Sequence, residues 1–182
     1  MLHPSSLHKK APATFSARFK TTKGSFVVKV TRSWAPKGAD RFYNLVYYHF
    51  YDNQPLFRVR PGFVVQWGIS MSTPIAKAWQ NATIKDDPRA QSNVKGTITF
   101  ATTGAPNSRT TQVFVNLGSN VFLNKQGFTP FGTITSGLSV FAHLYHGYGD
   151  GPPQNYMTAK GEHWVRKNYP KLDWITTARI VH

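Results

Sequence analysis

The hydrophobic residues of this chain change their spacing several times, and most of these changes predict short β-strands. Apolar and polar residues alternate over residues 15–19 and again over residues 26–30, with Lys23 and Gly24 between the two runs. Alternation with a period of two is typical of a strand that has one buried face, and a glycine between two such runs favours a turn. The pattern therefore predicts an antiparallel hairpin.

A helical spacing follows the hairpin. Ala39, Phe42, Leu45 and Val46 recur at intervals of three and four residues, and Pro36 stands where the first turn of a helix tolerates it. We expect an amphipathic helix that runs through Tyr48. A second helical stretch is predicted over residues 138–145, and a short helix is predicted over residues 156–168.

The rest of the chain is rich in short β-type runs separated by turn residues such as Pro61-Gly62. So many short strands with few helices predict a mainly β fold, a closed antiparallel β-barrel of about eight strands capped by two helices, because closure removes exposed sheet edges. The further strands are expected near residues 56–59, 63–67, 97–101, 112–115, 131–135 and 174–181.

Composition agrees with one folded domain. The chain has 182 residues and 20.5 kDa, and 40% of its residues are hydrophobic against 16% charged, which excludes wholesale disorder. Residues 1–14 are polar, basic and interrupted by Pro4 and Pro12, so we expect a flexible basic N-terminal arm. Residues 15–182 are then predicted to form a single barrel domain that includes a C-terminal extension.

The absence of cysteine excludes disulfides, thiolate nucleophiles and cysteine-ligated metals. The sequence contains neither a signal-peptide core nor a run of about 18 apolar residues, so no membrane span is predicted. A cytoplasmic location and export after removal of a leader both stay open.

The charge is strongly unbalanced, with 22 Lys and Arg against seven Asp and Glu, a net charge of +15. Such a charge favours association with polyanions. The cations are scattered, however: pairs such as Lys9-Lys10 and Arg166-Lys167 form no continuous stripe, and the aromatic motif of RNA-binding sheets is absent. A nucleic-acid-associated module therefore stays an alternative reading.

The residue patterns that several kinds of catalysis require are absent from the sequence. The seven acidic residues are sparse, Asp86-Asp87-Pro88 is typical of a turn, and no G-x-S-x-G elbow occurs. His143 and His146 lie three residues apart without an evident third ligand, so we expect no metal site. The glycines between Gly147 and Gly151 do not open a helix after a strand, so we expect no dinucleotide site.

The most informative stretch is Phe57-Arg-Val-Arg-Pro-Gly-Phe-Val-Val-Gln66, together with the segments 100–104 and 111–115. These segments resemble the cyclophilins, barrel-shaped peptidyl-prolyl isomerases, and the resemblance extends over most of the chain from about Phe15. The segments 126–132 and 170–173 are similar to the bacterial branch. The resemblance implies an isomerase that assists protein folding, works without a cofactor, acts as a monomer, and binds proline-containing peptides and unfolded proteins. The alternative is a proline-peptide binder with little catalysis.

The chemistry of this reaction suits the residues. Rotation about a peptide bond costs about 18–20 kcal/mol because it breaks amide resonance, and a donor aimed at the prolyl nitrogen is strongest when the amide is twisted. Arg58 is a permanently charged donor of this kind. The resemblance implies that Arg58, Gln66 and Phe63 are catalytic. It also implies a substrate-binding set of Val64, Ala101, Thr102, Gln112, Phe114, Phe122, Leu123 and Phe128.

Strand geometry adds two expectations. A period of two places Gln112 and Phe114 on one face of their strand. Phe63 and Gln66 would lie on opposite faces of a regular strand, so a bulge or twist after Gly62 is predicted.

The sequence departs from the cyclophilin pattern at four positions. No histidine precedes Arg58, and Thr102, Phe122 and Phe128 stand where many members have Asn, Trp and His. Main-chain pairing at Thr102 and an apolar pocket at Phe128 should survive these changes. The missing indole at Phe122 predicts weak cyclosporin binding.

Overall fold

A nine-stranded antiparallel sheet forms the body of the protein, in a computed structural model that describes residues 1–181. Three α-helices, α1 (Pro36–Tyr47), α2 (Thr73–Trp79) and α3 (Gln154–Asn168), accompany it, with 3-10 helices at Pro4–Ser6, Arg32–Trp34, Val121–Gln126 and Leu138–His143. The strands are β1 (Thr14–Thr21), β2 (Gly24–Thr31), β3 (Gln54–Pro55), β4 (Arg58–Arg60), β5 (Val64–Trp67), β6 (Thr97–Phe100), β7 (Val113–Asn116), β8 (Pro130–Ser136) and β9 (Trp174–Val181).

The sheet curls into an incompletely closed barrel, and its two edge strands follow one another directly in the chain. The order of neighbours is β3-β9-β1-β2-β8-β6-β7-β5-β4, and the terminal strands β3 and β4 are separated only by Leu56 and Phe57. β3 pairs with β9 and β4 pairs with β5. The mainly β antiparallel barrel is therefore confirmed, but its predicted full closure is wrong, because no ladder joins β3 to β4.

The local patterns predicted most elements. The hairpin of β1 and β2 pairs Phe15 with Val30 and Phe19 with Phe26, and α1 begins at Pro36 as expected. The helix predicted over 138–145 is a 3-10 helix that ends at His143. No helix was predicted at the position of α2. Among the described residues, none of the helices has both the length and the apolar character that a membrane span needs.

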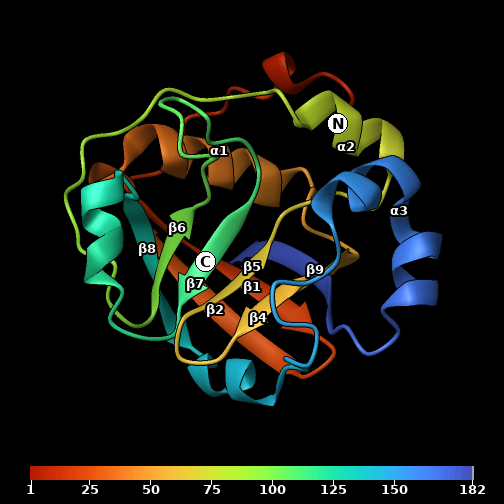
Figure 1. Cartoon of the computed structure of the whole chain (residues 1–182). Coiled ribbons are helices and arrows are strands. Elements are labelled where there is room, and N and C mark those ends of the chain that lie inside the picture. Colours follow the sequence, from red (N-terminus) through yellow and green to blue (C-terminus); the bar gives the residue numbers. More distant parts are fainter. Residues whose placement is uncertain (182) are drawn as a thin grey trace.

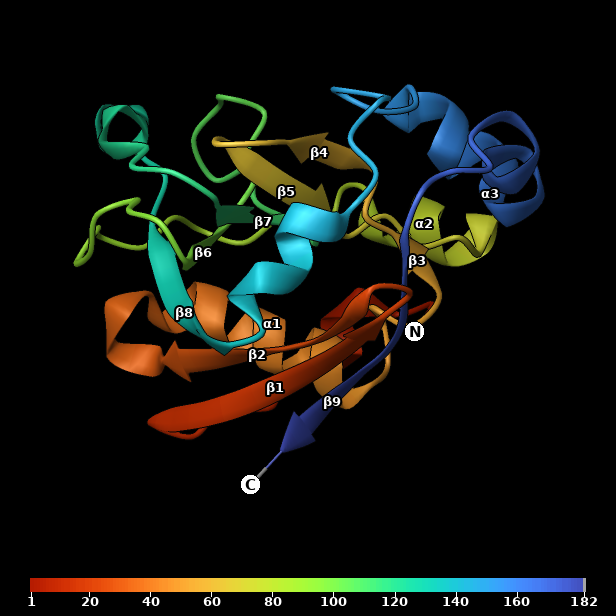
Figure 2. The same cartoon turned by 90° about the horizontal axis from the view of Figure 1, so that it is seen from below.

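Aromatic rings join the two sides of the barrel. Figure 2 shows β1, β2 and β9 on one side and β4, β5 and β7 on the opposite side. Trp67 of β5 lies 5.6 Å from Phe19 of β1 and 5.8 Å from Phe26 of β2, measured between ring centroids. Phe42 connects α1 to this core by contacting Phe131 at 4.9 Å. Close packing of these rings holds the two sides of the barrel in fixed positions.

Part of the N-terminal arm runs near α1 (Figure 1), and side chains of this helix hold it. Lys9 N donates to Asn44 Oδ1 at 3.0 Å, and Asn44 Nδ2 donates back to Lys9 O at 2.7 Å. Ala11 N donates to Asp40 Oδ1 at 2.8 Å. The flexibility of residues 1–14 stays a prediction, and these bonds favour an arm that is docked on the barrel.

The protein should lose stability in acid as Asp40 becomes protonated. Partial burial alone would raise the pKa of Asp40, but hydrogen bonds from Arg32 and Ala11, together with the charge of Arg32, lower it below its usual value of 3.8. Its stabilising effect is therefore complete above the unfolded pKa and is lost as the pH falls through the lowered folded pKa. Asp40→Asn should reduce the free energy of unfolding by about 1.5 kcal/mol at pH 7.

Urea unfolding of the wild type and Asp40→Asn at pH 7 and pH 2.5 checks this expectation. The difference between the two proteins should shrink at the lower pH. An equal difference at both pH values would contradict the role of the Asp40 carboxylate.

Candidate active site

A cleft of about 210 Å³ opens beside β5 and β7. It contains every site residue predicted from the sequence except Gln112 and Phe122, and it adds Gln154. Its lining residues are Arg58, Phe63, Val64, Gln66, Ala101, Thr102, Phe114, Leu123, Phe128 and Gln154.

Strand register explains why the central residues meet. Arg58 of β4 is paired with Gln66 of β5, and Gln66 is paired with Phe114 of β7. Residues directly opposite one another in antiparallel strands project on the same face. The register therefore places a cation, an amide and an aromatic ring in one row.

Phe63 reaches the cleft from a turn, not from a strand. It precedes β5, and its N donates to Arg60 O at 2.9 Å across a turn in which Gly62 has a φ of +73°. The predicted bulge in the strand is therefore wrong, because the strand begins one residue later. The carbonyl of Phe63 accepts hydrogen bonds from Leu117 N at 2.8 Å and Asn120 Nδ2 at 2.9 Å.

The floor of the cleft is apolar. Val64, Phe114 and Leu123 form a buried cluster, and Phe128 meets Phe114 edge to face at 5.6 Å. Phe122 lies outside this lining: it is 51% exposed and stacks on Phe63 at 6.0 Å. A dry, rigid pocket of this kind suits a small apolar ring.

Polar groups occupy the other side of the cleft. The Arg58 guanidinium lies 5.5 Å from the ring centroid of Phe63, and its Nη1 donates to Gln66 Oε1 at 3.3 Å. Gln66 Nε2 donates to Gln112 Oε1 at 2.8 Å. Gln112 thus contacts Gln66 but is not among the residues that line the cleft. Arg58 Nε also donates to Asp150 Oδ1 at 2.9 Å.

Buried amides hold the pocket walls from behind. Asn93 Nδ2 donates to Phe128 O at 3.0 Å, and Asn93 Oδ1 accepts from Thr99 Oγ1 at 2.9 Å. Asn120 Nδ2 donates to Phe63 O and to Asn116 Oδ1. Satisfied networks of this kind make a site rigid. Sequence analysis missed them, because an isolated asparagine carries no sign of burial.

The loop that follows β6 is fixed to α1. Arg41 Nη1 donates to Thr110 O at 3.0 Å, and Tyr51 Oη donates to Thr111 O at 3.0 Å. Burial lowers the pKa of Arg41 to about 10; nearby Tyr51 opposes this shift and the charge of Arg109 adds to it. Burial likewise raises the pKa of Tyr51. Arg41 therefore stays cationic at neutral pH and anchors this loop.

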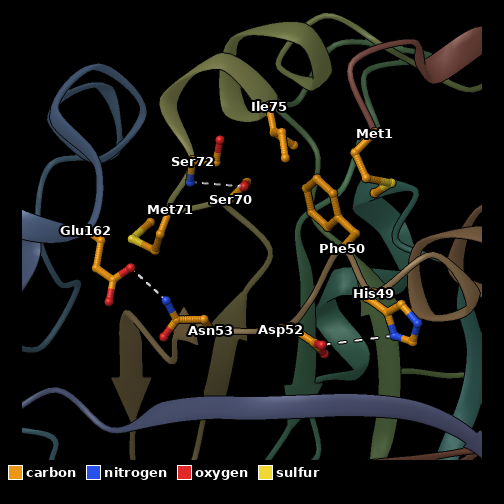
Figure 3. A pocket seen from close by; sticks show the side chains of 10 residues that line it. All are labelled: Met1, His49, Phe50, Asp52, Asn53, Ser70, Met71, Ser72, Ile75 and Glu162. Atoms are coloured by element: carbon orange, nitrogen blue, oxygen red, sulfur yellow. Dashed lines mark hydrogen bonds and ion pairs between the residues drawn. The ribbon is translucent and has the colours of Figure 1, made fainter.

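A second cavity of about 300 Å³ lies apart from the cleft, next to α2 and α3 (Figure 3). Four of its polar residues interact in pairs: Asn53 Nδ2 donates to Glu162 Oε2 at 2.7 Å, and His49 lies 4.0 Å from Asp52. In the part of the chain that the structure describes, no group of three His, Asp or Glu residues is placed to hold a metal ion. None of the predicted site residues lines this cavity.

Comparison with known proteins agrees with the geometry of the cleft. A family model described as cyclophilin type peptidyl-prolyl cis-trans isomerase/CLD matches residues 16–161. The chain belongs to the cyclophilin family. Peptidyl-prolyl cis-trans isomerase B of Escherichia coli is 31% identical over 86% of this chain and 93% of its own length. A peptidyl-prolyl cis-trans isomerase of Acinetobacter baylyi is 31% identical over 71% of each chain.

Solved structures agree on the fold of this cyclophilin. A cyclophilin type isomerase of Cryptosporidium parvum superposes with a TM-score of 0.73, covering 93% of this chain and 98% of its own, at 18% identity. A second structure of a C. parvum cyclophilin, obtained in the presence of the dipeptide Ala-Pro, gives a TM-score of 0.71. At this identity the likeness establishes the fold alone.

Three of the four positions at which this cyclophilin departs from the family pattern lie in or beside the cleft, whereas Phe57 is buried in a separate cluster with Met157 and Trp174. Thr102 and Phe128 line it, and Phe122 stacks at its rim. Asp150 and Gln154, which sequence analysis missed, come from the loop before α3 and from its first residue. The sequence offered no local signal for them, since that loop resembles any Gly- and Pro-rich connection.

Proposed function

We propose that this cyclophilin catalyses cis–trans rotation about X-Pro peptide bonds, with Arg58 as the group that stabilises the twisted amide. The position of Arg58 carries the proposal: its guanidinium lies at the edge of an apolar cleft, 5.5 Å from the ring of Phe63 and hydrogen-bonded to Gln66. A fixed cation beside a pocket of proline size is what this reaction needs.

The mechanism follows from the electronic change during rotation. A planar amide delocalises the nitrogen lone pair, and twisting restores that lone pair to the prolyl nitrogen. A donor from Arg58 therefore interacts more strongly with the twisted state than with either planar isomer, which lowers the barrier. Rotation makes and breaks no covalent bond, so these residues need no proton transfer.

The other cleft residues bind and orient the peptide. The apolar cluster of Val64, Phe114 and Leu123 takes the proline ring, with Phe63 and Phe128 as its walls. The backbone of Ala101 and Thr102 pairs with the peptide as an added strand does. Gln66 and, through it, Gln112 orient Arg58. Proline-containing peptides and unfolded proteins are the proposed substrates.

A cis-to-trans assay on a short X-Pro peptide tests the proposal. The wild-type chain should increase the rate of isomerisation in proportion to its concentration, above the uncatalysed rate of about one event in tens to hundreds of seconds. Absence of any rate increase would overturn the proposal and leave the alternative, a proline-peptide binder. That alternative is not favoured, since the chain retains Arg58 and its apolar cleft.

Cyclosporin should inhibit this chain weakly, and Phe122→Trp should tighten the inhibition. Phe122 is half exposed at the cleft rim, where an indole would add one hydrogen-bond donor. One net hydrogen bond corresponds to about fivefold in the inhibition constant. Titration of activity with cyclosporin measures it, with Val121→Trp, an exposed neighbour, as control. Equal inhibition of the wild type and Phe122→Trp would contradict this role.

The positive charge supports a separate proposal of weak polyanion binding by a monomeric chain. Binding to a generic duplex should fall steeply as salt rises, because phosphate contacts release counterions. Binding that is insensitive to salt would overturn it.

A further inference from the structure

The segment before α3 reaches the active-site cleft from a distant part of the chain. Asp150 lies 92 residues from Arg58 in sequence, and Gln154 lies 42 residues from Gln112. Val59 N of β4 donates to Gly149 O at 3.3 Å. A Cβ atom on Gly151 would overlap the carbonyl oxygen of Phe57. The segment is therefore packed against β4 with little space between the two backbones.

Asp150 holds Arg58 from the side opposite Gln66. Arg58 Nε donates to Asp150 Oδ1 at 2.9 Å, whereas Nη1 donates to Gln66 Oε1 at 3.3 Å. Two different nitrogens are thus fixed by two different elements of the fold. Nη2 has no hydrogen-bond partner within residues 1–181, so its two N–H groups and the second N–H of Nη1 are left for a bound peptide. Anchoring a planar guanidinium at two nitrogens restricts its rotation.

Gln154 ends a chain of amides that all point the same way. Gln66 accepts from Arg58 with Oε1, so its Nε2 faces away and donates to Gln112 Oε1 at 2.8 Å. Gln112 Nε2 then donates to Gln154 Oε1 at 2.8 Å. An amide has an acceptor at one end and a donor at the other. Reversing any one of these amides would place donor against donor or acceptor against acceptor. Arg58 can only donate, so it sets the direction of the chain, and Gln154 supplies the acceptor that Gln112 Nε2 then needs.

We propose that Asp150 and Gln154 are positioning residues of this site, and that the segment before α3 orients Arg58 through both of them. This inference rests on the proposed isomerase function. Asp150 fixes the guanidinium directly. Gln154 acts through Gln112 and Gln66, which keep the Gln66 carbonyl turned towards Arg58. A donor that is held in place before the amide twists does not need to reorganise during the reaction.

Asp150→Ala tests the first contact. Its kcat for an X-Pro peptide should fall about fivefold, the size of one net hydrogen bond, with KM nearly unchanged. Asp150→Asn, which keeps an acceptor, should recover part of the loss. In an Arg58→Ala background, Asp150→Ala should have no further effect, because Asp150 acts through Arg58.

Glu162→Gln is the matched control for Asp150. It removes one negative charge from α3, and its partners are Asn53 and Arg166, away from the cleft. Its kcat should equal that of the wild type. An Asp150→Ala protein with unchanged kcat, or a Glu162→Gln protein with the same loss as Asp150→Ala, would overturn the role of Asp150.

Gln154→Met tests the end of the amide chain. Methionine keeps the length of the side chain but removes the acceptor, so kcat should fall about twofold to threefold, less than one full net hydrogen bond because water can replace it. Gln154→Glu retains an acceptor and should restore kcat. Asn155→Ala, at the next position and outside the amide chain, is the control. Equal activity of Gln154→Met and the wild type would overturn the role of Gln154.

A spectroscopic measurement separates this inference from the proposed function. In ¹H–¹⁵N spectra, Asp150→Ala should shift the Arg58 Nε–H resonance, and Gln154→Met should shift the side-chain amide resonances of Gln112 and Gln66. If these shifts occur but the wild type does not accelerate isomerisation, the function fails and the positioning stands. If the wild type is active and no resonance moves, the positioning fails and the function stands.

Discussion

Replacing Arg58 with alanine should lower kcat/KM for an X-Pro peptide by about a hundredfold, the usual effect of removing one preorganised donor. Arg58 lines the cleft beside Phe63 and Gln66, and it is the only arginine or lysine among the cleft-lining residues in the described part of the chain. Without it, the pocket still binds the proline ring, but nothing charged meets the nitrogen lone pair of the twisted amide. KM should therefore change less than kcat.

Two variants make this result specific. Arg58→Lys should recover only part of the activity, because an ammonium group cannot hold Gln66 and Asp150 with two separate nitrogens of a planar fork. Arg60→Ala removes a neighbouring cation that lies 3.4 Å from the same Asp150 carboxylate but does not line the cleft. Its activity should stay within about twofold of the wild type.

An Arg58→Ala protein that keeps wild-type kcat/KM would contradict the role assigned to Arg58. Equal losses in Arg58→Ala and Arg60→Ala would also contradict it, because they would indicate a general effect of positive charge. Thermal unfolding of each variant checks that the fold is intact. Arg58 is partly exposed, so its removal should leave the midpoint nearly unchanged.

The largest effect on stability is expected at Asp87. Its carboxylate accepts from Lys37 N at 3.0 Å and from Gly38 N at 2.9 Å, at the start of α1, and from Arg109 Nη2 at 3.0 Å. The Asp87 and Arg109 side chains are 2% and 3% exposed. Asp87→Ala removes the buried carboxylate that pairs with Arg109 and leaves two helix donors without their acceptor, which should reduce the free energy of unfolding by about 3–5 kcal/mol.

Chemical denaturation of Asp87→Ala measures this loss directly, with Asp86→Ala as the matched control. Asp86 is the adjacent carboxylate; its side chain is 47% exposed, and it lies 3.5 Å from Arg109 Nε. Its removal should cost about 1 kcal/mol or less. Equal losses in the two variants would contradict the special role of Asp87. If Asp87→Ala does not fold, Asp87→Asn, which retains one acceptor oxygen, should give an intermediate loss.

Local patterning was sufficient for most of the fold. The alternation around Phe19 and Phe26 predicted a hairpin, because a period of two allows only one set of side chains to face the core. The spacing of Phe42 and Leu45 predicted α1 for the corresponding reason in a helix. α2 was missed, since a helix of seven residues has too few turns to show a period and depends on tertiary contacts.

The residues of the candidate site were likewise predicted only in part. Arg58, Gln66 and Phe114 were found because they lie in ordered motifs that resemble a known family, and strand register brings them together. Gln112 was predicted to share a face with Phe114; it precedes β7 and contacts the side chain of Gln66. Asp150 could not be found, because the Gly- and Pro-rich loop that carries it has no periodic pattern.

Motifs that resemble the cyclophilin family singled out Arg58, and the sequence by itself determined most of the strands and where α1 begins. These features depend on neighbours a few residues apart, whose relative positions the backbone geometry dictates. Only the tertiary structure decided that β3 and β4 form the edges of the sheet and that Asp87 lies buried at the start of α1. It also decided that Asp150 contacts Arg58 and that Gln154 contacts Gln112. Contacts across 42 to 92 residues depend on how the whole sheet curls, and no short segment contains that information.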